Sequence, residues 1–452
     1  MTQITTFDDA MAAIRERSGY DRGFISNPFA GDDAARLGLV RTARVLDLLG
    51  NPERDYPIVH VAGSKGKGST ASFIDSILRA AGQRSGRFLS PHLHSYRERF
   101  VVDNVLIGEA DFTKLVADVM SSAVEAERAD AAIGQLTAWE ISTAMALLWF
   151  SRSICDIAVI EVGMGGTLDA TNVIEPAASV ITTLDYEHTA ILGTTMREIA
   201  SNKAGIIKPG RPVVSAEQPV DAREVIEAKA QDASAPLSFA NRDWTVTGSD
   251  RSFSVSGAGW RHDGLVSSLI GPHQVDNAGL AIAAIYELRK LNLLPEETID
   301  ESVRQGIGSV FLPGRFEIVR HPSGVTFVLD GAHSPASTEA LARAVRERFP
   351  GAEATIVIGM LDDKDLDRLL QPLVPLANRW LVAPPDSPRA QQSDIIVAAL
   401  RARGAEPEVT GGVRDAIEQT IPVSSSATAR HVVVVTGSLS TVAEARVALG
   451  LA

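Results

Sequence analysis

Glycines and lysines alternate in residues 63–69, and this short run has the composition of a phosphate-binding loop. Glycines let backbone amides converge on an anion, and a helix that begins beside them adds positive potential. Lys67 can reach the β and γ phosphates of a nucleotide, and Ser69 stands where a hydroxyl ligates Mg²⁺. A flexible turn is the alternative, but a turn has no need of paired lysines beside three glycines. We expect the whole run to bind ATP: Gly63, Ser64, Lys65, Gly66, Lys67, Gly68 and Ser69.

The match of this run to the standard Walker pattern is incomplete. That pattern has glycine where Val61 stands, and serine or threonine where Gly68 stands. The context nevertheless supports the loop, because a β-branched apolar run at residues 58–62 predicts a strand before it. An apolar-periodic segment at residues 70–81 predicts a helix after it.

Glu161 stands near the end of an apolar run, residues 156–162, that predicts a buried strand. Ligands bind beyond the carboxyl ends of parallel strands, so we expect this carboxylate to point into a crevice. Mg²⁺ prefers oxygen ligands, which makes Glu161 a candidate metal ligand. The alternative is that Glu161 is a strand-end carboxylate in an ion pair with a nearby cation. For Glu161 taken alone, the metal-ligand and ion-pair interpretations have equal weight.

His188 closes the run Asp185-Tyr-Glu-His188, which follows a third predicted strand at residues 179–184. A lone histidine in a loop is usually a surface residue, but this one shares the expected crevice with Lys67 and Glu161. Lys203 precedes an apolar turn further along the chain. Its spacing alone predicts a lysine on the surface of a helix.

Strands and helices alternate along the first part of the chain. Helical patterns at residues 112–126 and 139–150 separate the predicted strands, which indicates an α/β fold with a parallel sheet and helices on both faces. Residues 244–270 instead alternate apolar and polar side chains and predict a small antiparallel β region. A helix is predicted at residues 274–291.

A plausible domain hinge, Leu312-Pro-Gly-Arg315, precedes a second alternating region. The strands predicted there lie at residues 326–330, 355–359, 380–383 and 432–436, and the helices at 338–348, 394–403 and 413–419. We therefore expect an N-terminal P-loop ATPase domain at residues 1–311. A C-terminal Rossmann-like α/β domain of about 140 residues is expected at 312–452.

Composition limits the classes of partner. The net charge of −13 argues against a nucleic-acid surface, because phosphate neutralisation requires clustered lysine and arginine. The N-terminal residues lack the basic and apolar segments of a signal peptide, and the longest apolar stretch, at residues 144–150, is too short to span a bilayer. The single cysteine, Cys155, lies in an apolar stretch and is interpreted as a small buried residue. We expect a cytoplasmic protein with no membrane partner.

Taken together, these runs resemble folylpolyglutamate synthase and dihydrofolate synthase, members of the Mur ligase superfamily. The matching blocks are ordered along nearly the whole chain, which makes them specific as a set although each is weak alone. They are residues 37–52, 60–70, 90–93 with 97–99, 137–140, 161–172, 203–208, 271–274 with Asn277, 313–317, 330–333 and 436–439.

The resemblance implies a role for each matching residue. It implies that Lys67 holds the ATP phosphates, that Ser69 and Glu161 bind one Mg²⁺, and that His188 binds a second. Lys203 matches a lysine that is carbamylated in members of the family. A carbamate is an anion and can ligate the second metal, whereas the ammonium group of a free lysine cannot. The nucleotide contacts implied elsewhere are Asn277, Arg315, Asp330 and His333. A monovalent cation is a further cofactor that the resemblance admits.

The family reaction is ligation of L-glutamate to a folate or to dihydropteroate through an acyl phosphate. The resemblance thus implies ATP, L-glutamate and one of these pterins as substrates of a monomeric enzyme, with closure of the C-terminal domain over ATP. Four residues depart from the family pattern: Ser64-Lys65 replaces Thr-Asn, Thr167 replaces arginine and Ser334 replaces asparagine. A related ligase for a non-folate acid, a cell-wall ligase, and a nucleotide-binding module without ligase activity are the alternatives.

Overall fold

The chain forms two units in this computed structural model, which describes residues 3–18, 32–362, 365–421 and 431–451. Unit 1 comprises Met1–Ser267 and Val275–Val310, and unit 2 comprises Ser268–Gln274 and Phe311–Ala452. A short segment of unit 2 therefore interrupts unit 1 along the sequence. Each unit has its own sheet and its own core.

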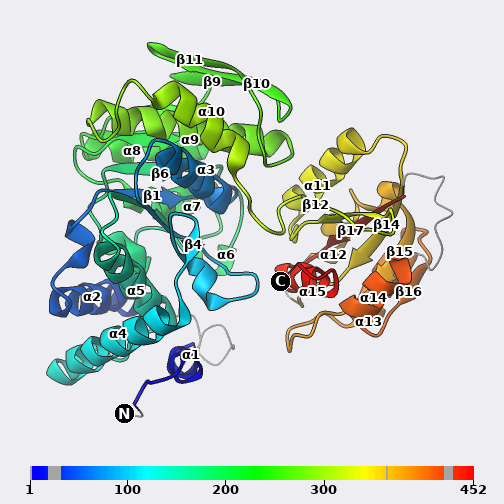
Figure 1. Ribbon diagram of the computed structural model, residues 1–452, viewed down its shortest axis with the longest axis horizontal. Coiled ribbons are helices and arrows are strands. Elements are labelled where there is room, and N and C mark those ends of the chain that lie inside the picture. Colours follow the sequence, from blue (N-terminus) through cyan, green and yellow to red (C-terminus); the bar gives the residue numbers. More distant parts are fainter. Residues whose placement is uncertain (1–2, 19–31, 363–364, 422–430, 452) are drawn as a thin grey trace. The chain divides into compact units, whose positions relative to one another are not determined.

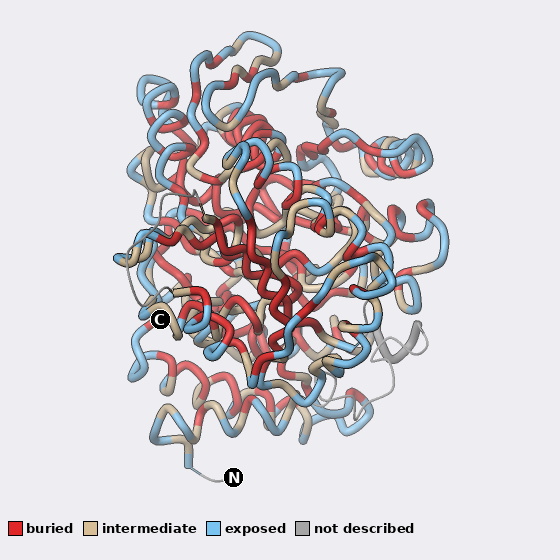
Figure 2. The backbone as a smooth tube through the Cα atoms, turned by 90° about the vertical axis from the view of Figure 1, so that its right-hand side faces the viewer, coloured by how far each residue is buried: buried red, intermediate tan, exposed pale blue. Residues whose placement is uncertain are grey.

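Unit 1 is built on a sheet with the strand order β4-β3-β2-β5-β1-β6-β7-β8 (Figure 1). All neighbours pair in parallel except β2 with β3 and β3 with β4, so the predicted parallel sheet is confirmed. Every residue of β1, β5, β6 and β7 is buried, and such buried backbone is red in Figure 2. The strands are β1 (Ile58–Ala62), β2 (Ser85–Phe88), β3 (Phe100–Val102), β4 (Val105–Leu106), β5 (Ile157–Glu161), β6 (Ala178–Ile181), β7 (Val213–Ser215) and β8 (Leu237–Phe239).

Helices cover this sheet because their apolar faces match its buried strands. One core cluster joins α1, α2, α4 and α5 to β2, β3 and β5, and a second joins α7 and α8 to β6 and β7. Thr137 caps α5 in a capping box with Glu140, which satisfies two backbone donors at the helix start. The helices are α1 (Phe7–Glu16), α2 (Asp32–Leu48), α3 (Lys67–Ala80), α4 (Glu109–Ala129), α5 (Ala138–Arg152), α6 (Thr189–Leu192), α7 (Met196–Lys203) and α8 (Val220–Asp232).

The predicted antiparallel region is a three-stranded sheet of β9 (Trp244–Ser249), β10 (Ser252–Gly257) and β11 (Trp260–Leu265). It packs on α9 (Pro272–Lys290), close to α10 (Ile299–Ser309) (Figure 1). The approach is close: a β-carbon at Gly279 of α9 would lie 2.1 Å from Cγ2 of Val246. Glycine is therefore required where this sheet meets the helix.

Unit 2 contains a six-stranded sheet in the order β12-β13-β17-β14-β15-β16, parallel except for the β12–β13 pair. The predicted second α/β region is thus confirmed. Its strands are β12 (Glu317–Arg320), β13 (Thr326–Leu329), β14 (Glu353–Ile358), β15 (Ala377–Val382), β16 (Pro407–Val409) and β17 (His431–Thr436). Its helices are α11 (Pro335–Arg348), α12 (Leu366–Leu370), α13 (Ser393–Arg401), α14 (Val413–Thr420) and α15 (Leu439–Ala448).

One predicted element is shorter than expected. The third strand was predicted at residues 179–184, but β6 ends at Ile181, where its pairing with β1 and β7 stops. Cys155 is buried, as predicted, and burial raises the pKa of its thiol to about 12. Among the helices of the described ranges, none combines the length and the hydropathy that a membrane span requires.

Candidate functional site

The glycine-rich loop lies between β1 and α3, the position that its flanking patterns predicted. Gly66 is the residue before α3, and its φ of 86° lies in the left-handed region that glycine adopts without strain. Asn277 packs against it, because a β-carbon at Gly66 would lie 2.2 Å from Oδ1 of Asn277. The structure thus brings Asn277 of α9 to the loop, and the nucleotide contact that the resemblance implies for this residue stays a prediction.

Backbone contacts hold the loop against the segment that follows β6. The carbonyl of Thr183 accepts the amide hydrogens of Ser64 and Lys65, both at 3.1 Å. The Ser64 hydroxyl donates to the carbonyl of Asp185 at 3.0 Å. Gly63 fits only without a side chain, because a β-carbon there would be 1.9 Å from Oγ1 of Thr182. The shape of the loop therefore depends on the backbone beyond β6.

Three lysines meet at this loop around one carboxylate. Lys203 Nζ donates to the carbonyl of Gly63 at 2.8 Å and to Glu187 Oε1 at 2.7 Å. Lys67 Nζ donates to the same carbonyl at 3.1 Å, and Lys65 Nζ lies 3.8 Å from Glu187 Oε2. Three ammonium groups and one carboxylate leave a net positive charge, which suits the phosphates of a nucleotide.

Burial controls the ionisation of this cluster. Burial lowers the pKa of Lys203 to about 8, against the opposing effect of Glu187. Burial also works against ionisation of Glu187, but the ammonium groups of Lys67, Lys203 and Lys65 together hold its pKa below the usual value. The carboxylate therefore stays charged at neutral pH.

One prediction about this cluster is wrong, and one of its residues was not predicted. Spacing predicted Lys203 on a helix surface, but its side chain is only 1% exposed, because its ammonium group bonds Gly63 and Glu187 beyond the ends of β1 and β6. Glu187 was not singled out from the sequence. The signal available was a second carboxylate in the run Asp185-Tyr-Glu-His188, directly before the histidine.

Glu161 lies beside the first turn of α3. A β-carbon at Gly68 would be 3.6 Å from Glu161 Oε2, and the amide of Ser90 donates to that same oxygen at 3.0 Å. Ser69 is buried in the same turn. These oxygen donors fit a hard cation such as Mg²⁺. Across the described ranges, no group of three or more His, Cys, Asp and Glu side chains is close enough to hold a metal by itself.

His188 lies on the exposed segment after β6 and precedes the short helix α6. Its φ of 47° is in the left-handed region, which is uncommon for a residue with a side chain. The role of His188 as a metal ligand stays a prediction.

Unit 2 brings together three further residues that the resemblance implied. Asp330 follows β13, and its two carboxylate oxygens accept the amides of Phe316 and Ala332, both at 2.8 Å. A β-carbon at Gly331 would lie 3.0 Å from Nη1 of Arg315. His333 Nδ1 lies 2.7 Å from the carbonyl of Gly331. Burial raises the pKa of Asp330, with Arg315 opposing the shift.

An aromatic group lies at the carboxyl end of β2. Trp139 stacks on Phe88 with ring centroids 5.3 Å apart, and the Arg99 guanidinium lies 4.5 Å from the ring centroid of Tyr96. Arg99 also donates from Nε to His92 Nδ1 at 3.1 Å. Flat apolar faces beside one cation can bind a flat aromatic molecule that carries a carboxylate.

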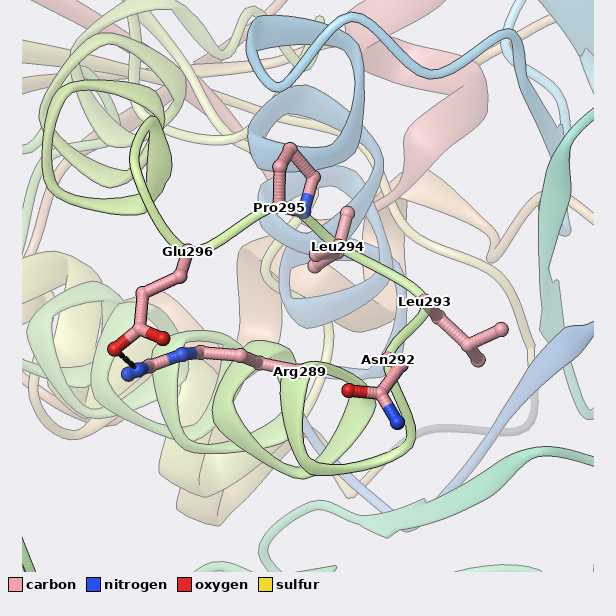
Figure 3. A pocket seen from close by; sticks show the side chains of 6 residues that line it. All are labelled: Arg289, Asn292, Leu293, Leu294, Pro295 and Glu296. Atoms are coloured by element: carbon pink, nitrogen blue, oxygen red, sulfur yellow. Dashed lines mark hydrogen bonds and ion pairs between the residues drawn. The ribbon is translucent and has the colours of Figure 1, made fainter.

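A surface cavity of about 280 Å³ lies at the C-terminal end of α9 (Figure 3). None of the predicted site residues lines it, and its one cation, Arg289, is paired with Glu296. The cavity is therefore not the expected ATP site. Its lining residues are Arg289, Asn292, Leu293, Leu294, Pro295 and Glu296.

Comparison with known proteins agrees with this geometry. Residues 61–285 match the Mur ligase middle domain, and residues 314–439 match the Mur ligase glutamate ligase domain. An α/β fold with a glycine-lysine loop and these two domains defines the class of ATP-dependent Mur-type ligases.

The relatives narrow this class. The dihydrofolate synthase/folylpolyglutamate synthase of Bacillus subtilis is 35% identical over 90% of this chain and 94% of its own length. A probable bifunctional folylpolyglutamate synthase/dihydropteroate synthase of Halobacterium salinarum is 38% identical over 90% of this chain, which spans about half (49%) of that protein. A Mycobacterium tuberculosis folylpolyglutamate synthase structure, complexed with ADP and AMPPCP, has a TM-score of 0.83 and 31% identity, covering 91% of this chain and 95% of that one.

The chain belongs to the Mur ligase family, on the folylpolyglutamate and dihydrofolate synthase branch. The predicted family is thereby confirmed, and so is the expectation of an ATP-dependent ligase.

Proposed function

We propose that this chain ligates L-glutamate to a reduced folate, and that dihydropteroate is a second acceptor. The observation that carries the proposal is the convergence of Lys67 and Lys203 on the carbonyl of Gly63, inside a loop shaped for phosphates. A binding module needs a loop for the nucleotide but has no use for a buried second lysine. The relatives named above support the folate branch.

The reaction follows from the poor reactivity of carboxylates. The folate carboxylate attacks the γ-phosphorus of ATP, the bond to ADP breaks, and an acyl phosphate forms with a good leaving group. The glutamate amine then attacks the acyl carbon, the amide forms, and phosphate and a proton leave. Lys67 and the loop amides hold the phosphates and offset charge that develops on them. The site must exclude water, because hydrolysis would waste the acyl phosphate.

Mg²⁺, when bound, offsets charge on the phosphoryl oxygens. Ser69 and Glu161 would hold one ion, and His188 with a carbamylated Lys203 a second. Carbamylation joins the neutral amine to CO₂ with loss of a proton. Burial, which lowers the pKa of Lys203 to about 8, favours that neutral amine.

The aromatic group at the end of β2 is our proposed place for the flat ring of the pterin substrate. Trp139 and Tyr96 offer ring faces there, and Arg99 offers a cation for a carboxylate. We also propose that Arg315, Asp330 and His333 contact the nucleotide, and that a hinge near Leu312 joins the two domains.

A phosphate-release assay tests the proposal. With ATP, Mg²⁺ and glutamate, tetrahydrofolate or dihydropteroate should stimulate phosphate release, and Lys67→Ala should abolish the stimulation. Lys229→Ala, on the exposed face of α8, is the matched control and should behave as the parent. Intact ADP binding without stimulation by either pterin would contradict folate ligation.

A ligase for another acid is the second candidate, and Thr167 favours it. Thr167 stands where the family pattern has arginine, and it donates from Oγ1 to the carbonyl of Asn202 at 2.9 Å. A cation is thereby missing from the loop that follows Glu161. Phosphate release with other carboxylic acids, but not with pterins, would support this candidate.

A further inference from the structure

The side chain of Gln218 is a buried amide in the segment between β7 and α8. Its Oε1 accepts the amide hydrogen of Leu184 at 3.0 Å. Its Nε2 donates to the carbonyl of Thr182 at 3.0 Å and to the hydroxyl of Ser215 at 3.2 Å. A buried amide that makes three hydrogen bonds is costly to replace, because its buried partners would each lose a hydrogen bond.

These contacts lie just beyond the ladder between β6 and β7, which ends at the pair Ile181 and Ser215. The amide of Thr182 donates to the carbonyl of Ala62 in β1, whereas the carbonyl of Thr182 accepts from Gln218. In a regular strand both groups of a residue face the same neighbour, so the extended chain turns at Thr182. After this turn, Gln218 binds the backbone of Thr182 and of Leu184, on either side of Thr183.

The residue between these two faces the opposite way, toward the phosphate loop. Thr183 presents its carbonyl to the amides of Ser64 and Lys65, at 3.1 Å each. The direction of that carbonyl is fixed by the backbone on both sides of it, and Gln218 holds both sides. A rotation of the Thr183 peptide would leave two loop amides without this acceptor.

We propose that Gln218 is a positioning residue for the ATP phosphates, acting through the carbonyl of Thr183 on the glycine-rich loop. The side chain touches neither the nucleotide nor the reacting atoms in this scheme. It sets the backbone on which the loop amides depend. The inference rests on the proposed function in so far as the loop binds ATP.

The direct test is hydrogen exchange of the loop together with ADP binding in Gln218→Met. Methionine has a similar length but can neither donate nor accept as the amide does. We expect faster exchange in the peptide that covers residues 60–70 and ADP binding weakened by about tenfold, as loss of one net hydrogen bond predicts. Gln231→Met, on the exposed face of α8, is the matched control and should leave both unchanged.

Steady-state kinetics separate positioning from general loss of structure. The KM for ATP should rise about tenfold in Gln218→Met, while the KM for glutamate stays within about twofold of the parent. Gln218→Glu keeps an oxygen that accepts the amide hydrogen of Leu184, but it replaces the Nε2 donor by a second oxygen that repels the carbonyl oxygen of Thr182. It should give the same pattern, and it serves as the second variant if Gln218→Met does not fold.

The outcomes distinguish this inference from the proposed function. Unchanged exchange and unchanged ADP affinity in both variants would overturn the role of Gln218, whatever the substrate. Equal increases in the KM for ATP and for glutamate would also overturn it. A parent protein that binds ADP but ignores pterins would refute folate ligation and leave the role of Gln218 standing.

Discussion

His60 should make the stability of unit 1 depend on pH. This histidine lies in β1 with 0% exposure, directly before the phosphate loop, and its Nε2 is 2.8 Å from the hydroxyl of Thr171. That hydroxyl already donates to Asp169 at 2.6 Å, so His60 Nε2 is the donor to Thr171. Within the described residues, Nδ1 has no hydrogen-bond partner. A second proton on the ring would therefore be buried without compensation.

The magnitude follows from linkage. Burial, with Lys208 as a smaller cause, lowers the pKa of His60 from 6.5 to about 3. Between these values the unfolded chain binds more protons than the folded one, so the free energy of unfolding rises with pH. The stabilisation is complete above pH 6.5 and is lost as pH falls toward 3. The loss is about 2 kcal/mol at pH 5 and reaches about 5 kcal/mol below pH 3.

The assay compares the parent with His60→Phe, which removes the titrating ring but keeps an aromatic side chain. Denaturant unfolding at pH 5 and pH 8 gives the free energy of each protein, and the difference between the proteins isolates His60. Other buried histidines, such as His92 with a pKa of about 4, titrate in both proteins and cancel. The parent should lose about 2 kcal/mol more than the variant between pH 8 and pH 5. Parallel pH profiles of the two proteins would refute the reasoning.

Three further predictions concern the site and the domains. Gly66→Ala should weaken ADP binding by at least about tenfold, because it combines a φ of 86° with a β-carbon 2.2 Å from Asn277. The control Gly68→Ala, with 3.6 Å to Glu161, should stay within about threefold in the same calorimetric titration. Lys203→Ala should lower turnover by about a hundredfold or more, and near-normal turnover would show that the carbamate role is wrong. Limited proteolysis near Leu312 should release two folded halves, and a single protected chain would count against a hinge there.

Much of the fold was predictable because its signals are local. The strand at residues 58–62 and the helix that follows the loop are encoded by short apolar patterns, and both are present as β1 and α3. The short strands β3 and β4 were not predicted, since three or two residues carry no periodic signal. The end of β6 was placed three residues too late, because the β-branched residues Thr182 and Thr183 and the apolar Leu184 prolong the strand pattern after the ladder stops.

The candidate site also contains residues that the sequence indicates and residues whose role only the tertiary structure shows. The glycine-lysine loop and Glu161 are found from sequence, since the loop follows one strand and Glu161 is the last residue of another. Lys203 and Glu187 are far less evident, because their meaning lies in an ion pair between segments that only the fold brings together. Burial, which lowers the pKa of Lys203, has no local signature either.

Residue order alone determined the α/β class, the phosphate loop and the resemblance to folate-type ligases, because these depend on short-range patterns and on ordered blocks. Tertiary structure decided which lysines meet at Gly63, that Glu187 is their counter-ion, and that Gln218 binds the backbone on both sides of Thr183. The physical reason is that buried polar groups must find partners, and the chain supplies them from positions distant in sequence.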